Sequence, residues 1–185
     1  MNISPEEAQE ALAAIQQTNV RTRKAYGYNG YYSIVWGLVW FFGFLASQYL
    51  QANVAGWIWG GLVLVGWVMS AALGINQGKY LRSVLGPRIA FFYLALFVFG
   101  AVWFVISRPQ SIMQIILLLV TLIMFGGVAV GVFARTIPII IGCVAITVLV
   151  LIGYYLLPAY FYLWVAISCG LSMFGTGLYV RLRWR

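Results

Sequence analysis

The chain has 185 residues, of which 64% are hydrophobic and only 8% are charged. A soluble domain is about half apolar and about a quarter charged, so this composition excludes a soluble globular domain and a disordered chain. The net charge of +8 is also found in nucleic-acid-binding proteins, but here the basic residues stand singly or in small groups between apolar runs. That scatter is typical of membrane topology signals, and we expect no nucleic-acid partner.

The segment at residues 1–27 is the only part that resembles a water-facing element. It lacks the apolar stretch of a cleavable signal peptide, so we expect the first spanning helix to direct insertion. A short amphipathic cytoplasmic helix is predicted at residues 4–24, where Ser4 and Glu7 form a capping box. Apolar side chains at helical spacing form one stripe, which is expected to contact a cytoplasmic protein: Ala8, Ala11, Leu12 and Ile15. The alternative is that this stripe packs on its own bundle.

Residues 28–185 predict a transmembrane domain. They contain six apolar stretches of about the 20 residues that a helix needs to cross a bilayer. The expected spans are 30–50, 54–75, 88–107, 111–133, 136–157 and 159–180. Apolar runs of this length satisfy their backbone hydrogen bonds in lipid only as helices. The predicted fold class is therefore all-α, a polytopic membrane bundle of six transmembrane helices preceded by the N-terminal helix.

The basic residues predict the orientation of this bundle. If the N-terminus lies in the cytoplasm, six spans leave only Arg108 on the outer side, as the positive-inside bias requires. We therefore expect a multi-pass protein of a bacterial inner membrane, the plasma membrane, with both termini cytoplasmic. Basic residues at the inner leaflet are expected to contact anionic lipid headgroups. These are Lys79, Arg82, Arg88, Arg181, Arg183 and Arg185.

Pairs of small residues spaced four apart predict close contacts between helix backbones. The pairs are Ser33 and Gly37, Gly56 and Gly60, and Gly127 and Gly131. With six helices in one chain, we expect these pairs to act inside the bundle. The alternatives are a homo-oligomer or assembly with another membrane protein, and a glycine seam facing lipid would favour the latter.

The residue inventory argues against catalysis. The chain has no His and no Asp, and its three Glu all lie in the N-terminal segment. Acid–base pairs, zinc sites and an intramembrane proton carrier therefore lack their usual residues. Neither Cys143 nor Cys169 has a basic residue nearby in the sequence that would activate it as a nucleophile. We expect no enzymatic activity and no catalytic, cofactor or metal site.

Two functions remain open from the sequence. The first is a non-enzymatic, membrane-embedded interaction or regulatory subunit whose N-terminal helix contacts a cytoplasmic partner. The alternative is a uniporter, channel or facilitator for a small neutral, lipidic or anionic solute, without proton coupling. Such a path needs polar side chains between the helices, and the candidates are Thr121, Thr147 and Ser172. Hydroxyls in membrane helices also commonly bond to backbone carbonyls or across helices, which needs no solute.

Overall fold

The structure is a computed structural model, and it describes residues 30–78, 85–133 and 135–183. The predicted N-terminal helix, with its stripe at Ala8, Ala11, Leu12 and Ile15, lies outside the described residues. The same holds for the basic residues Lys79, Arg82 and Arg185, and for the side chain of Arg183.

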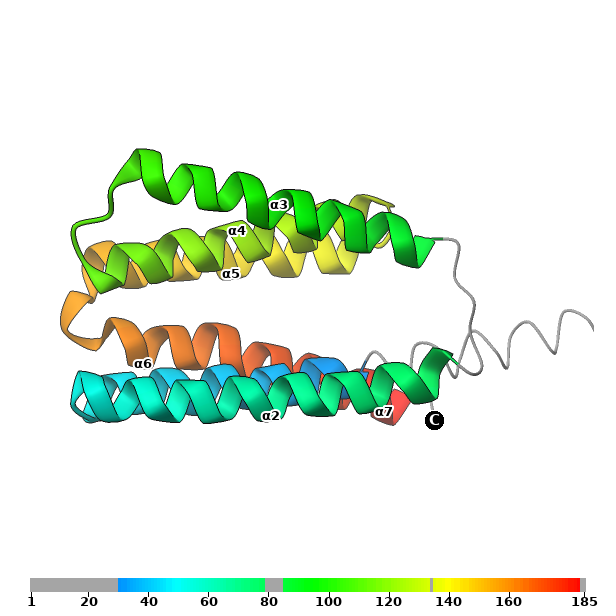
Figure 1. Ribbon diagram of the computed structural model, residues 1–185, viewed down its shortest axis with the longest axis horizontal. Helices are drawn as coiled ribbons and strands as arrows, with labels where there is room; N and C mark the ends of the chain where they lie inside the picture. Colours follow the sequence, from blue (N-terminus) through cyan, green and yellow to red (C-terminus); the bar gives the residue numbers. More distant parts are fainter. Residues whose placement is uncertain (1–29, 79–84, 134, 184–185) are drawn as a thin grey trace, which may run out of the picture.

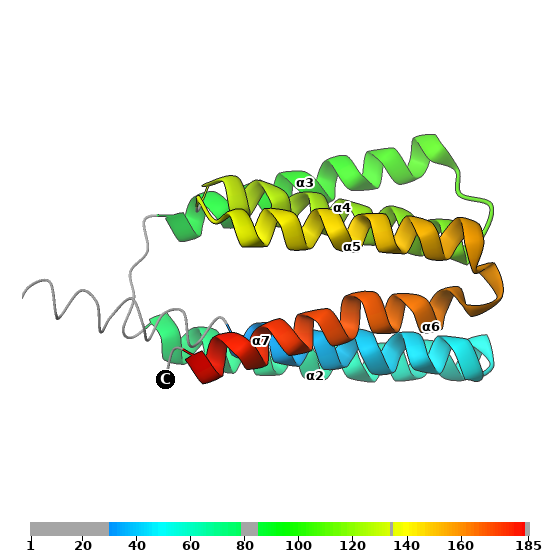
Figure 2. The same cartoon turned by 180° about the vertical axis from the view of Figure 1, so that it is seen from behind.

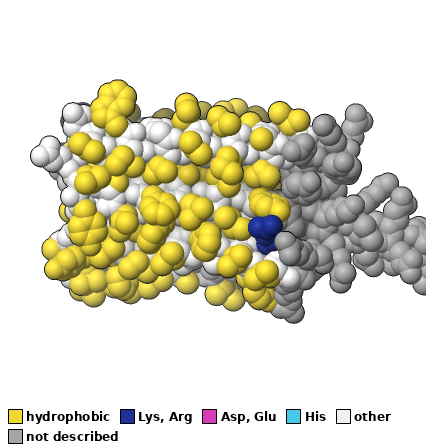
Figure 3. Space-filling model, turned by 90° about the horizontal axis from the view of Figure 1, so that it is seen from below, with side chains coloured by type: hydrophobic (Ala, Val, Ile, Leu, Met, Phe, Trp, Pro, Cys, Tyr) yellow, Lys and Arg dark blue, Asp and Glu magenta, His cyan; other side chains and the backbone are white. Residues whose placement is uncertain are grey.

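The described chain contains six helices that are long and apolar enough to cross a membrane, which confirms the predicted number. They are Gly30–Tyr49, α2 (Ala52–Gly78), α3 (Leu85–Ser107), α4 (Ile112–Phe133), α5 (Ile137–Leu156) and a last span at Pro158–Leu182. These bounds differ by a few residues from the ranges expected from sequence. Large apolar side chains point outward along the bundle, and Trp57 on α2 is 80% exposed. Figure 3 shows apolar side chains covering one face of the molecule. Such a surface suits lipid and identifies a multi-pass membrane protein.

The six helices form two layers (Figures 1 and 2). One layer contains α3, α4 and α5, and the other contains the Gly30–Tyr49 helix, α2 and the last span. Fully buried side chains come from both layers, namely Val120 on α4, Val150 on α5 and Phe161 in the last span. They join one apolar cluster with Phe44 of the Gly30–Tyr49 helix. The core of the bundle therefore lies where the two layers meet.

Glycines bring the backbones of the Gly30–Tyr49 helix and the last span close together. A Cβ added at Gly177 would lie 2.6 Å from the carbonyl oxygen of Gly30, and one added at Gly170 would lie 2.7 Å from the backbone of Phe41. Gly37 faces the backbone of the same span. The glycines are spaced seven apart on both helices, which run in opposite directions. The sequence predicted the contact at Gly37 but not its glycine partners on the last span.

We expected one α-helix at residues 159–180. The last span instead changes its helix type along its length. It begins with a 3-10 turn, η1 (Pro158–Tyr160), continues as α6 (Phe161–Val165), widens to a π-helix, η2 (Ala166–Leu171), and ends as α7 (Ser172–Arg183). A π-helical turn accommodates an extra residue and so changes which side chains face a neighbouring helix. It lies where Gly170 meets the first helix, and Ser168, Cys169 and Gly170 are all buried there.

The tight turn into the last span is held by Gln48, a residue that our sequence reasoning missed. Its side-chain amide Nε2 donates to the carbonyl oxygen of Ala159 at 3.0 Å, and its Oε1 accepts from the backbone N–H of Leu163 at 3.2 Å. Backbone N–H groups at the start of a helix lack partners within the helix. Gln48 accepts from one of them, at Leu163, and donates to the carbonyl oxygen of Ala159, so it joins the end of the first helix to the start of the last span.

Candidate functional site

The three residues predicted to line a polar path lie on different helices. Thr121 on α4 donates to the carbonyl oxygen of Leu117 at 2.9 Å, and Thr147 on α5 donates to that of Cys143 at 2.9 Å. Ser172 begins α7 and is exposed. Within the described ranges, no hydrogen bond joins any two of the three. The two threonine hydroxyls are therefore paired with their own helices.

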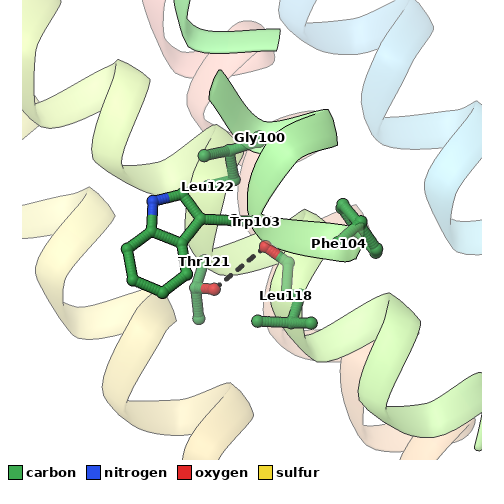
Figure 4. A pocket seen from close by; sticks show the side chains of 6 residues that line it. All are labelled: Gly100, Trp103, Phe104, Leu118, Thr121 and Leu122. Atoms are coloured by element: carbon green, nitrogen blue, oxygen red, sulfur yellow. Dashed lines mark hydrogen bonds between the residues drawn. The ribbon is translucent and has the colours of Figure 1, made fainter. Parts of the chain in front are cut away.

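A crevice of about 210 Å³ lies between α3 and α4 (Figure 4). It is lined by Gly100, Trp103, Phe104, Leu118, Thr121 and Leu122. Trp103 is 63% exposed, so the crevice borders the outer surface of the bundle. Its one side-chain hydroxyl, on Thr121, is turned toward the carbonyl oxygen of Leu118 at 3.0 Å, as Figure 4 shows. The surface left for a ligand is therefore almost wholly apolar.

One side of α2 is attached to the Gly30–Tyr49 helix by two indole hydrogen bonds. Trp36 donates from Nε1 to Oγ of Ser70 at 3.1 Å, and Trp59 donates from Nε1 to Oγ of Ser47 at 2.9 Å. The ring of Trp59 also lies against Gly43, where an added Cβ would come within 2.6 Å of it. Each bond crosses between the two helices, so together they determine which face of α2 turns inward.

The other side of α2 carries glycines that have no packing partner among the described residues. Among the residues that the structure describes, nothing lies within 4 Å of a Cβ built at Gly56, Gly60 or Gly61. Trp57 and Leu64 flank them and are 80% and 67% exposed. Our expectation that Gly56 and Gly60 pack inside the bundle is therefore wrong. The reason is that the indole bonds orient the opposite side of α2 inward, and the spacing of the glycines alone does not contain that information.

The third pair of small residues behaves as expected. A Cβ added at Gly127 would lie 2.5 Å from the sulfur of Cys143, and one added at Gly131 would lie 2.7 Å from the side chain of Ile140. Both neighbours belong to α5, so the pair brings α4 and α5 together within the chain. The glycines of α2 differ from them in having no such neighbour.

Two of the basic residues predicted to meet lipid headgroups have described side chains. Arg88, near the start of α3, is exposed, and the guanidinium of Arg181 lies 4.7 Å from the ring centroid of Tyr31. Both helix ends lie at the end of the bundle where the Gly30–Tyr49 helix begins (Figure 1). That position suits the headgroup level, where a cation over an aromatic ring is a common arrangement.

Groups that hold metals do not gather in the part of the chain that the structure describes, where no three His, Cys, Asp or Glu come together. Cys143 and Cys169 are both free thiols, and Cys169 is buried in the core. Comparison with known proteins adds no relative, because no family model, curated protein or solved structure matches this chain. A functional assignment therefore has to be argued from the surfaces of the bundle.

Proposed function

We propose that this protein is a non-enzymatic interaction subunit, embedded in a bacterial inner membrane, that binds a transmembrane helix of another membrane protein along α2. The observation that carries the proposal is the open face of α2, formed by Gly56, Gly60 and Gly61 with Trp57 and Leu64 beside them. Both chain ends would lie in the cytoplasm, where the predicted N-terminal stripe adds a second contact to the same role.

A helix suits this face better than lipid does. Glycine within a helix costs about 1 kcal/mol relative to alanine, and lipid tails pack equally well on larger apolar side chains. Glycines four apart instead let a second backbone approach closely, which is the main source of contact energy between membrane helices. The glycines on α4 and on the last span already do this inside the bundle. Gly56 and Gly60 on α2 have the same spacing as the pair on α4, and among the described residues no neighbour occupies them.

The experiment places a photo-crosslinking amino acid at Trp57 in cells that express the full-length protein. We expect an adduct with another membrane protein, and Gly56→Leu with Gly60→Leu should reduce it at least ten-fold because the added side chains keep the partner backbone away. The matched control is Gly142→Leu on α5, where a Cβ also meets nothing within 4 Å.

The outcomes separate the possible occupants. An adduct with an unrelated membrane protein that the control retains and the double variant loses supports the proposal. An adduct of twice the mass of the chain would show a second copy instead, and lipid adducts alone would refute the proposal. If the N-terminal stripe binds a cytoplasmic protein, Leu12→Glu with Ile15→Glu should release that protein and leave the adduct at Trp57 intact.

A further inference from the structure

We infer that the crevice between α3 and α4 binds one acyl chain of a membrane phospholipid whose phosphate is held by Arg108. The inference rests on three features that lie next to one another. These are the apolar crevice, a cation one helical turn beyond it, and a turn whose other polar groups are already paired. It does not depend on the contact proposed for α2, which lies on a different helix.

The size and lining of the crevice suit part of a hydrocarbon chain. Pockets that enclose small-molecule ligands usually measure about 300–1,000 Å³ and place several polar groups for orientation. The crevice measures about 210 Å³, and its only side-chain hydroxyl, on Thr121, bonds to its own helix. Gly100 keeps α3 without a side chain where Leu122 of α4 approaches. A flexible chain of methylenes fits such a space, because its lining is almost wholly apolar and leaves no side-chain hydroxyl unbonded.

Arg108 stands directly beyond the crevice. Its backbone N–H donates to the carbonyl oxygen of Phe104, a residue that lines the crevice, at 3.2 Å. The cation is therefore one helical turn farther toward the bundle end, at the level where headgroups meet the hydrocarbon. Its side chain is exposed. The described residues include no carboxylate side chain that could pair with Arg108, because Glu6, Glu7 and Glu10 all precede the first span. Arg108 follows the third span, at the opposite end of the bundle from the start of the first.

The remaining polar groups of this turn are used to build it. The Oε1 of Gln114 accepts from the backbone N–H of Gln110 at 2.6 Å, and Nε2 of Gln110 donates to the carbonyl oxygen of Arg108 at 3.0 Å. Oγ of Ser111 accepts from the backbone N–H of Gln114 at 3.3 Å. These bonds hold the backbone that carries the guanidinium. A guanidinium binds phosphate oxygens through two parallel N–H groups, which a phospholipid supplies directly above its acyl chains.

The test measures the affinity of a diacyl phosphatidylglycerol for the purified full-length protein in detergent, with bound lipid counted by native mass spectrometry. Arg108→Gly should weaken binding at least ten-fold. Its matched control, Arg135→Gly, removes the same charge from a second exposed arginine with positive φ, which follows α4 and lies away from the crevice. Glycine adopts positive φ without strain, so both variants should fold.

The acyl contact is tested by filling the crevice. Leu118→Trp should also weaken binding at least ten-fold, whereas Ile141→Trp, at an exposed isoleucine of α5, should leave it unchanged. Diacylglycerol lacks the phosphate and glycerol phosphate lacks the chains, so each should bind at least ten-fold more weakly than the whole lipid.

Several results would overturn the inference. Equal losses in the two arginine variants would show only a general charge effect. Diacylglycerol that binds as tightly as the phospholipid would remove the role of Arg108, and an unchanged Leu118→Trp variant would place the acyl chain elsewhere.

Discussion

Two arginines end helices in a conformation that usually belongs to glycine. Arg108 follows α3 with φ of 42°, and Arg135 follows α4 with φ of 53°. An L-residue in the left-handed region costs about 1–2 kcal/mol, because its Cβ crowds the following carbonyl oxygen. The backbone N–H of Arg135 donates to the carbonyl oxygen of Val132 at 3.1 Å, so the turn is closed despite that cost. A charged residue at these ends also suits the headgroup level, which is where each span has to stop.

At this scale we predict that Arg135→Gly stabilises the protein. Glycine removes the strain of about 1–2 kcal/mol but adds about 0.5–1 kcal/mol of backbone entropy to the unfolded chain. The net gain is therefore up to about 1.5 kcal/mol, measured as a higher midpoint of thermal unfolding in detergent. Arg135→Ala keeps the Cβ and removes the same charge, so it should not raise the midpoint. Equal midpoints for the two variants would argue against backbone strain at this position.

Among the elements, the first helix and the last span meet through backbone atoms. Gly170 and Gly177 face backbone atoms of the Gly30–Tyr49 helix, and backbone cannot move aside as a flexible side chain can. The π-helix η2 coincides with this contact, and Gln48 holds the two elements together at the other end. By contrast, α2 is attached through the side chains of Trp36 and Trp59. These differences make the last span a fixed part of the core and leave α2 at its edge.

At the element scale, Gly170→Leu is predicted to destabilise the bundle much more than Gly142→Leu. An added side chain at Gly170 would meet the backbone of Phe41 at 2.7 Å, whereas the same side chain at Gly142 meets open space. Overpacking of this kind costs about 1–3 kcal/mol or more. Thermal unfolding in detergent should show a clear drop for the first variant and almost none for the second. Equal unfolding midpoints would contradict the close contact of these helices.

The described bundle consists of two layers of helices, and many more of its large apolar side chains are exposed than buried. Buried side chains collect where the two layers meet, and most large apolar side chains face outward. The described basic residues follow the same plan. The ends of α3, α4 and the last span that carry Arg88, Arg135 and Arg181 lie together, and Arg108 follows the opposite end of α3 (Figure 1). Such an asymmetry orients a bundle in the membrane, because positive loops are retained in the cytoplasm.

For the whole molecule we predict that epitope tags at the two termini are accessible from the same, cytoplasmic side. A tag inserted in the turn at residues 108–111 should be accessible only from the opposite side. The physical reason is that an even number of spans returns the chain to its starting side. Labelling with an antibody before and after opening the membrane measures all three positions. A C-terminal tag on the side of the 108–111 turn would show that one of the six helices does not span the bilayer.

Much of the architecture follows from local composition. Six apolar runs of bilayer length became six helices, and Pro138 and Pro158 stand in the first turn of the elements they begin. The roles of individual surface residues do not follow in the same way. Gly56 and Gly127 have equivalent small-residue patterns, but one faces open space and the other faces Cys143. Periodicity shows which residues share a helix face, but the rotation of that helix in the bundle depends on distant partners such as Ser47 and Ser70.

The protein class, the number of spans and their approximate ends follow from the amino-acid sequence, because lipid imposes a length and a polarity on every segment independently. Three features depend instead on packing between helices: the last span widens to a π-helix at Gly170, Gln48 bonds to the turn before it, and α2 turns its glycines outward. In a bilayer, outward and inward faces are equally apolar. The hydrophobic pattern that orients helices in water therefore gives no information about the rotation of a helix in lipid. Close packing and a few hydrogen bonds determine that rotation instead.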